Sequence, residues 1–294
     1  MIDYEKYKRQ ILDVNKSPKQ IMKEIMMPQE VFKYRKFIDS NREQTYWKES
    51  MKGEMYFSLP TKFNSNDSND CKMQYDKERV RKEYVREFEE YRKKGNNEII
   101  RNSWECLEKI IIEIRENLKI GCFTVCSPEN AFMWENEDFG GKGRGYCIEY
   151  AVNEDMFYPN TIKFLPVSYM KNYIDMTEVI IDFIHNIKSL EKDKILYANG
   201  YNFALSKLLK YKDEEEWRII VPRNRYEEYF NLDGKSKKDF SQVIKAIYLG
   251  ADYKQLDNSE EYKKYALKIC EQKNIPLYEM KRGGKKLTKI QINK

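Results

Sequence analysis

The chain has 294 residues, of which 41% are apolar and 14% aromatic, so it can bury a sizeable core. Its 54 basic and 48 acidic side chains leave a net charge of +6, spread over the whole length. This charge is too small and too evenly spread to predict a nucleic-acid or anionic-membrane partner.

Cysteine and histidine usage excludes several kinds of site. Six irregularly spaced cysteines and a single histidine, His185, give no zinc-binding pattern and no Ser-His-Asp triad, so no metal is expected. No signal peptide or long apolar run is visible, which predicts a cytoplasmic protein with reduced thiols and no membrane partner.

The first half of the chain begins with helical patterns and then forms a strand, a helix and a second strand. Side chains alternate over 30–37, which predicts a strand with Lys33 and Arg35 on one face. The elements predicted in chain order are a helical extension (1–29), a strand (30–37), a helix ending at Gly53, a strand (54–59), a polar loop (64–70) and a helical pair (76–119).

The second half contains most of the strand patterns. The predicted elements are strands at 120–126, 144–152 and 161–169, helices within 176–211, strands at 215–222 and 243–249, a helix at 259–272, and strands at 276–281 and 286–292. The sum predicts one α+β domain over 30–294 with a mixed or antiparallel sheet core. Helical insertions are expected at about 76–119 and 172–212.

Two carboxylates near the end of the chain carry the first chemical signal. Glu214 and Glu216 stand two residues apart in what reads as a strand, so they are expected on the same side. Breaking a bond between a sugar and a base builds positive charge on the sugar ring, which a carboxylate stabilises. One of the pair would hold the ribose hydroxyls, and the other would position or deprotonate an acceptor.

Other side chains supply groups that would hold a dinucleotide. Arg35 suits a charge-assisted grip on diphosphate or ribose, and Ser58 ends a predicted strand where it would brace the acidic partner. Tyr34 and Phe57 are candidates for stacking on nicotinamide. The glycine-rich turn 139–145 places Arg144 where it could contact substrate, although the turn matches no known phosphate-binding fingerprint.

A plainer interpretation of the same residues stays open. The run 213–216 also reads as a solvated acidic turn with Arg218 as its ion-pair partner, and Arg35 as an exposed strand cation. The basic residues Arg79, Arg81 and Arg86 could serve a nucleic-acid-binding protein, but alternating charges there favour a salt-bridged, solvated helix face.

Several motifs occur in an order that resembles a known family. They are Lys33-Tyr34-Arg35, the segment 53–60, Cys122-Phe123, Met133-Trp134, the segment 145–150, the segment 214–218 and the segment 246–250. Together they resemble the bacterial domain of unknown function 2971 family from about residue 31 onward. That family in turn resembles the ADP-ribosyltransferase superfamily.

The resemblance implies an enzyme that uses NAD as its substrate. It implies that Arg35 grips NAD, that Ser58 is the strand serine, that Glu216 is the catalytic glutamate and that Glu214 faces the acceptor. ADP-ribose would pass to a macromolecular acceptor, a protein or a nucleic acid, or to water. A role as a toxin or phage-defence effector, with an antitoxin or defence partner, is implied in the same way.

The main rival is a ligand-binding or sensor module with a degenerate cleft. It rests on Glu135-Asn136-Glu137, which stand where the resembled family carries a His-Tyr pair. Such a module would bind NAD without turnover, or would not bind it.

Overall fold

A computed structural model provides the coordinates of the chain. It describes residues 27–37, 46–63, 70–89, 93–95, 118–153, 163–186, 203–231, 235–283 and 286–293, with a few single positions between 104 and 116. The expected helical extension over 1–29 falls almost entirely outside these residues.

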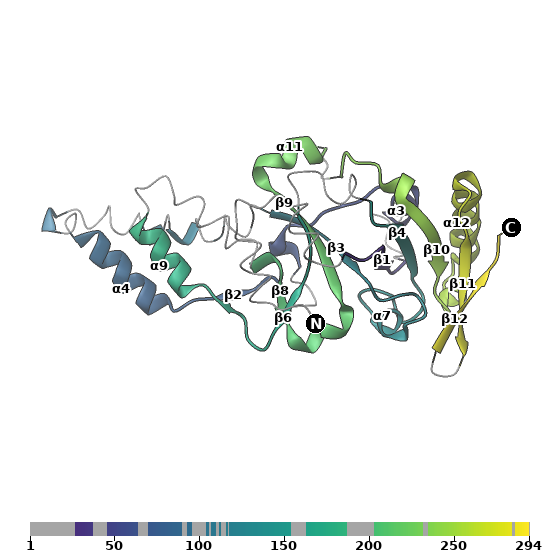
Figure 1. Cartoon of the computed structure of the whole chain (residues 1–294), viewed down its shortest axis with the longest axis horizontal. Helices are drawn as coiled ribbons and strands as arrows, with labels where there is room; N and C mark the ends of the chain where they lie inside the picture. The colour runs from purple at the N-terminus through teal and green to yellow at the C-terminus, as the bar shows by residue number, and fades with distance from the viewer. Residues whose placement is uncertain are drawn as a thin grey trace.

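An eight-stranded sheet forms the centre of the molecule (Figure 1). Its strand order is β12-β11-β10-β4-β1-β3-β9-β5, and neighbours run antiparallel except for the parallel pair β10 and β11. The strands are β1 (Glu30–Arg35), β3 (Leu118–Thr124), β4 (Tyr146–Ala151), β5 (Lys163–Pro166), β9 (Glu216–Pro222), β10 (Ile244–Leu249), β11 (Leu277–Gly283) and β12 (Lys286–Gln291). The predicted α+β class with a largely antiparallel sheet is confirmed.

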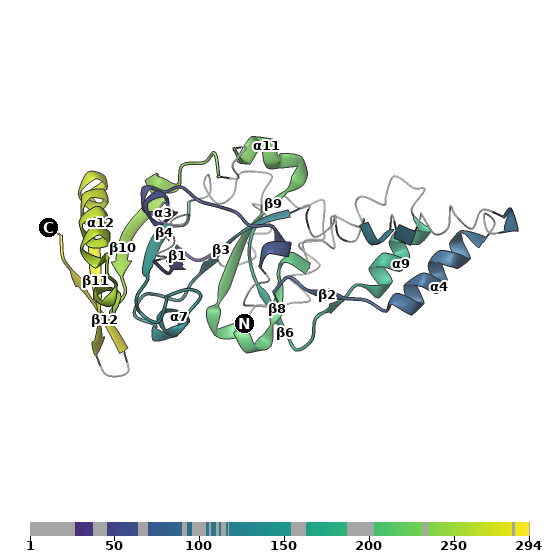
Figure 2. The ribbon, with the colours of Figure 1, turned by 180° about the vertical axis from the view of Figure 1, so that it is seen from behind.

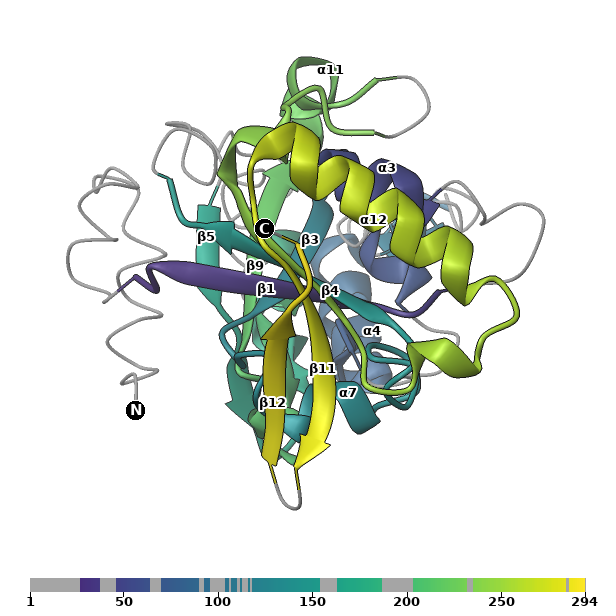
Figure 3. The same cartoon turned by 90° about the vertical axis from the view of Figure 1, so that its right-hand side faces the viewer.

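Helices cover both faces of this sheet. On one face, α3 (Tyr46–Lys52) lies beside α12 (Ser259–Lys273) (Figure 3). The Trp47 ring of α3 meets the Tyr262 ring of α12 edge to face, with 4.9 Å between the ring centroids. On the other face, α7 (Ala131–Glu135) packs Trp134 against Tyr34. Successive side chains of a strand point to opposite faces of the sheet, so the core has two parts. Ile148 of β4 belongs to the hydrophobic cluster on the face of α3 and α12, and its neighbour Cys147 belongs to the cluster on the face of α7.

The sheet opens between β1 and β3. β1 pairs with β4 along its whole length, but its only Cα partnership with β3 joins Phe32 to Thr124. β3 in turn pairs with β9 from Leu118 to Thr124. The two halves of the sheet therefore diverge beyond Phe32 and Thr124, and Lys33 and Arg35 of β1 lie at the edge of this opening.

A helical arm projects from the sheet at the end remote from α12 (Figures 1 and 2). It consists of α4 (Lys77–Glu87) and α9 (Thr177–His185), which pack on each other, and it is joined to the body by the parallel strands β2 (Met73–Gln74) and β7 (Ile174–Asp175). The helices α4 and α9, one from each predicted insertion, thus meet in one arm. Arg79 pairs with Glu178 and Arg86 with Glu83, as expected for a salt-bridged face.

Short elements complete the described parts of the chain. They are η1 (Pro60–Lys62), β6 (Ser168–Met170), β8 (Ser206–Leu208), η2 (Leu209–Glu214), η3 (Arg223–Arg225), α11 (Tyr226–Tyr229), η4 (Phe240–Val243) and η5 (Tyr253–Gln255). The helix predicted through residue 211 is therefore wrong after Ala204, where a strand and a 3-10 helix follow.

The strand predicted over 54–59 is also wrong as a regular strand. The segment is extended but makes only isolated bridges, between Tyr56 and Lys235 and between Ser58 and Ile120. Because successive residues find partners in different parts of the chain, no continuous ladder forms. Gly53 does end α3 as predicted, with a φ of 104°.

The backbone of the glycine-rich turn that follows α7 packs closely against the backbone of Arg35. The Gly145 amide donates to the Gly140 carbonyl at 2.9 Å, and the Gly145 carbonyl accepts from the Gly250 amide at 2.9 Å. A Cβ atom at Gly145 would lie 2.2 Å from the Arg35 carbonyl oxygen. Only glycine fits between these backbones.

Gly145→Ala should therefore destabilise the fold and displace Arg35. We expect the free energy of unfolding to fall by roughly 2 kcal/mol or more, as for other overpacked interiors. Gly283→Ala is the matched control, because its Cβ would lie 3.4 Å from its nearest neighbour, the Lys286 carbonyl. Urea unfolding of both variants tests this, and equal small losses would contradict it.

Candidate functional site

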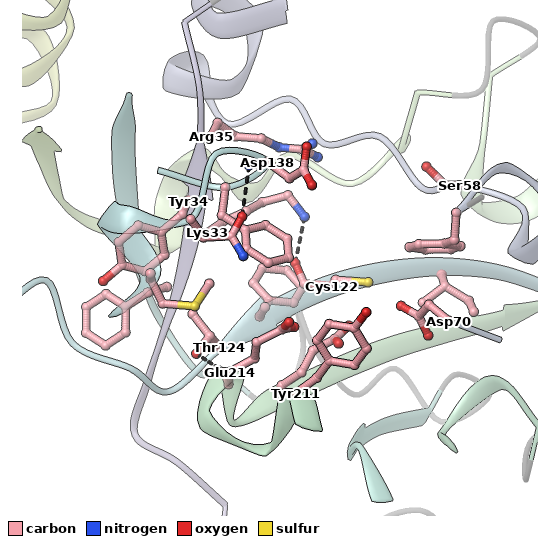
Figure 4. Close-up of a pocket in the computed structure, with 18 of the residues that line it drawn as sticks. Lys33, Tyr34, Arg35, Ser58, Asp70, Cys122, Thr124, Asp138, Tyr211 and Glu214 are labelled. Carbon is pink, nitrogen blue, oxygen red and sulfur yellow. Dashed lines mark hydrogen bonds between the residues drawn. The ribbon is translucent and has the colours of Figure 1, made fainter. Parts of the chain in front are cut away.

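A cavity of about 490 Å³ lies where β1 and β3 diverge (Figure 4). Its walls come from segments far apart in sequence: β1, the extended segment after α3, β3, the turn after α7, β8, η2 and the start of β9. The predicted site residues that line it are Tyr34, Arg35, Ser58, Glu214 and Glu216. Ligand pockets of this size are common in enzymes and receptors.

Two predicted site residues lie elsewhere. Phe57 belongs to the core and its ring packs against Phe230, because its neighbours Tyr56 and Ser58 take the positions that face the cavity. Arg144 is exposed, and its Nε donates to the Gly141 carbonyl of its own turn at 3.2 Å. The sequence predicted that both residues contact the cofactor, but neither Phe57 nor Arg144 lines this cavity.

Tyr34 is a rigid part of the wall. Its hydroxyl donates to the Cys126 carbonyl at 3.0 Å, and its ring meets Trp134 edge to face at 5.0 Å. Burial raises its pKa well above the usual range. Tyr34 thus shapes the cavity as a neutral aromatic group.

A buried ionic cluster forms the acidic wall. Arg218, which is fully buried, donates through Nε to Glu216 Oε1 at 2.7 Å and through Nη2 to Asp70 Oδ2 at 2.6 Å. Lys207 Nζ donates to Glu214 Oε2 at 2.6 Å and to Glu216 Oε2 at 3.3 Å. Three carboxylates thus share two cations, so this group of five side chains carries one excess negative charge.

Glu214 and Glu216 meet by a route that the sequence pattern did not predict. Glu214 ends η2, Glu215 adopts the left-handed conformation with a φ of 43°, and β9 begins only at Glu216. The predicted common strand is therefore wrong. The turn at Glu215 nevertheless brings both carboxylates to Lys207.

Glu216 is held as an anion. Burial alone would raise its pKa, but the charges of Arg218 and Lys207 outweigh burial and lower the pKa from 4.5 to about 2. The Arg218 guanidinium, flanked by two carboxylates, keeps its own pKa well above the usual range despite burial. The interpretation of Arg218 as an ion-pair partner is confirmed, but the cluster is buried and not a solvated turn.

This pKa predicts a specific loss of stability in acid. A carboxylate whose pKa is lowered in the folded state favours folding above its unfolded pKa, and the benefit is lost as the pH falls from about 4.5 towards 2. The shift corresponds to about 3 kcal/mol. We expect the stability difference between the wild type and Glu216→Gln to shrink by about 2 kcal/mol between about pH 7 and about pH 3, because the rest is lost only as the pH falls through about 2.

Chemical denaturation of both proteins across that pH range checks this expectation. Glu271→Gln, at an exposed position of α12, controls for the loss of a surface carboxylate. A stability difference that stays constant with pH would show that the cluster does not hold Glu216 ionised.

The opposite wall carries positive charge from β1. Lys33, Arg35 and Lys36 all line the cavity, and Lys33 Nζ donates to the Cys122 carbonyl of β3 at 2.7 Å. Burial and then the charge of Arg35 lower the pKa of Lys33 from 10.5 to about 7. Figure 4 shows Lys33 and Arg35 extending from β1 on one side, with Glu214 and Tyr211 opposite.

Sequence reasoning missed three residues of this site. Lys33 had a usable signal, because it stands two residues before Arg35 on the same strand face. Asp70 is the last residue of a predicted polar loop and Lys207 lies in a stretch that reads as a helix, so neither showed a pattern. Their roles depend on the buried contacts with Arg218 and the glutamates.

Comparisons with known proteins were made for the whole chain. Protein-family models, curated proteins and solved structures gave no match. The resemblance to the domain of unknown function 2971 family and to ADP-ribosyltransferases therefore stays a prediction. Within the described ranges, no helix is long and apolar enough to cross a bilayer, and no group of three or more His, Cys, Asp or Glu is arranged to hold a metal ion.

Proposed function

We propose that this cavity binds NAD and cleaves the bond between nicotinamide and ribose, transferring ADP-ribose to a macromolecular acceptor or to water. The observation that carries the proposal is that Arg35, Ser58 and Glu216, from three separate segments, line one cavity. The acceptor would be a protein or a nucleic acid. An effector role in toxicity or phage defence, with a protein that restrains it, belongs to the same proposal.

The charge distribution supports NAD as the ligand. Its nicotinamide ring is a cation and its diphosphate is an anion, so a matching site needs walls of opposite sign. The β1 wall supplies Arg35, which is exposed and suited to a bidentate grip on phosphate oxygens. The excess negative charge around Glu216 would face the nicotinamide ribose.

Glu216 suits the chemical step as an electrostatic stabiliser. When the glycosidic bond breaks, its electron pair moves to the nicotinamide nitrogen, which becomes neutral, and the ribose carbon becomes cationic. A fixed anion beside that carbon stabilises the transition state. The two Glu216 oxygens accept three hydrogen bonds from Arg218 and Lys207, and the Cys122 side chain also hydrogen-bonds to this carboxylate, so the anion is held in a fixed position at the cavity wall.

A binding or sensor module is the second candidate, and the ion pairs of Glu216 favour it. Its charge is already shared with Arg218 and Lys207, which would weaken its effect on a ribose cation. NAD binding without nicotinamide release would support this candidate.

Calorimetric titration with NAD tests the binding half of the proposal. Arg35→Met should weaken NAD binding at least tenfold, because a charge-assisted hydrogen bond contributes about 1.5–3 kcal/mol. Arg35 is exposed, so the variant should fold normally. Arg223→Met, at an exposed arginine outside the cavity, is the control. Equal affinities in all three proteins would refute this assignment of Arg35.

A further inference from the structure

Lys33 occupies the gap where the sheet splits. Its backbone pairs with Ile148 of β4, while its side chain crosses towards β3 and donates to the Cys122 carbonyl at 2.7 Å. Its Nζ also lies 4.8 Å from the centroid of the Phe123 ring. A carbonyl and an aromatic ring thus fix the amine at the cavity wall.

The charged groups around Lys33 act in opposite directions. Arg35 on the same strand disfavours its protonation, whereas Glu216 on β9 favours it. Burial is the largest influence, and the net result is a pKa of about 7. The other charged side chains of the cavity are Lys36, Asp70, Asp138, Lys207 and Glu214.

The two glutamates of the cavity are poorly suited to accept a proton. Glu216, with a pKa of about 2, is a weak base at neutral pH. Glu214 is buried with its Oε2 2.6 Å from Lys207 Nζ, so protonating it would break a buried ion pair. The sequence-based role of Glu214 in deprotonating an acceptor is therefore better filled by another group.

We propose that Lys33 Nζ is the general base of this cavity, taking the proton from the hydroxyl, amine or water that attacks the ribose carbon. The inference rests on the proposed function and gives a role to Lys33, which the sequence analysis named in a motif but to which it assigned no chemistry. A base is most effective when its pKa lies near the working pH, and burial together with the charge of Arg35 lowers the pKa of Lys33 to about 7. The N–H that binds the Cys122 carbonyl leaves the nitrogen lone pair available.

The step balances without a further reactant. The acceptor atom forms a bond to the ribose carbon, and the bond to nicotinamide breaks with its electron pair remaining on the nicotinamide nitrogen. The acceptor proton passes to the neutral Lys33 amine, which becomes an ammonium and later returns the proton to solvent. Glu216 stays ionised throughout and stabilises the ribose cation.

Two substitutions of Lys33 distinguish a role as a general base from a role as a fixed positive charge. Lys33→Arg keeps a positive charge and a donor for the Cys122 carbonyl, but arginine does not deprotonate in proteins. Lys33→Met removes the charge and keeps the length of the side chain. We expect both variants to lose about 10²–10⁴-fold in turnover, with Lys33→Arg keeping its affinity for NAD.

The pH dependence of turnover tests the role of Lys33 against that of a lysine elsewhere in the sheet. The wild-type rate should rise with a midpoint near pH 7, and this limb should be absent from the residual rate of both variants. Lys119→Arg, at another half-buried lysine of the sheet that lies 4.2 Å from the Phe230 ring centroid and outside the cavity, should retain the wild-type profile. Lys33→Arg turnover within tenfold of the wild type would overturn the inference.

Amine labelling measures the ionisation of Lys33 without NAD. The folded full-length chain is treated with limiting acetic anhydride at a series of pH values, and modification of each lysine is quantified by mass spectrometry. The Lys33 labelling rate should have its midpoint near pH 7, against about 10.4 for an ordinary lysine. A midpoint above about 9 would overturn the inference even if NAD is cleaved. Absence of NAD cleavage by the wild type, with a midpoint near 7, would instead refute the proposed function and with it the base role.

Discussion

Arg218→Met should lower the free energy of unfolding by about 3–5 kcal/mol, the usual effect of removing one partner from a buried ion pair. Arg218 has no exposed surface and donates to Asp70, to Glu216 and to the Ala204 carbonyl at 2.7 Å. Its removal leaves the buried carboxylates with Lys207 as the cation shown bound to them. Methionine fills much of the space but cannot compensate the charge.

The matched control is a surface ion pair. Arg225 Nη1 lies 2.9 Å from Glu228 Oε2, and both side chains are substantially exposed. Arg225→Met should change stability by less than about 1 kcal/mol, because solvent screens such pairs. Urea unfolding at pH 7 compares both variants with the wild type. Similar small losses would mean that the buried cluster is not held by Arg218.

Adding Asp70→Asn to Arg218→Met provides an independent check. If the loss arises from uncompensated carboxylates, neutralising Asp70 should recover part of it. A double variant less stable than Arg218→Met alone would point to lost packing as the cause.

The sequence predicted those helices and strands that have a local pattern of polar and apolar residues. Alternating side chains identified β1, and local strand and helix patterns identified β4, β9 and α12 close to their observed bounds. The segment 54–59 failed because its bridges to Lys235 and Ile120 are long-range contacts with no local signature.

The sequence predicted which residues form the candidate site better than it predicted how these residues are arranged. Arg35, Ser58, Glu214 and Glu216 were proposed from the sequence, and all four line one cavity. Their environment was not predictable, because Arg218 and Lys207 are buried in ion pairs that include the distant Asp70. Phe57 was misplaced because its segment was treated as a strand face.

Glu216→Gln carries the second large expected effect, on the rate of NAD cleavage. Glutamine preserves shape but has no charge, so it cannot stabilise a ribose cation. Removing one preorganised electrostatic contact at a reacting centre costs about 10²–10³-fold in rate, and we expect at least that loss in kcat. NAD affinity should change little, since Arg35 and Ser58 remain.

Loss of folding must be separated from loss of catalysis in this variant. Glu216 accepts hydrogen bonds from Arg218 and Lys207, so the glutamine amide would face donors and stability should fall. Circular dichroism and NAD titration at a temperature well below unfolding show whether the variant is native. Ser58→Ala removes an exposed hydroxyl of the same cavity, so it should reduce turnover without a comparable loss of stability.

Nicotinamide release from NAD, followed over time for the purified wild type and Glu216→Gln, tests the central claim most directly. The account predicts steady release by the wild type and at least a hundredfold slower release by the folded variant. Equal release by both proteins, or none by a wild type that binds NAD, would contradict the claim that this cavity breaks the glycosidic bond.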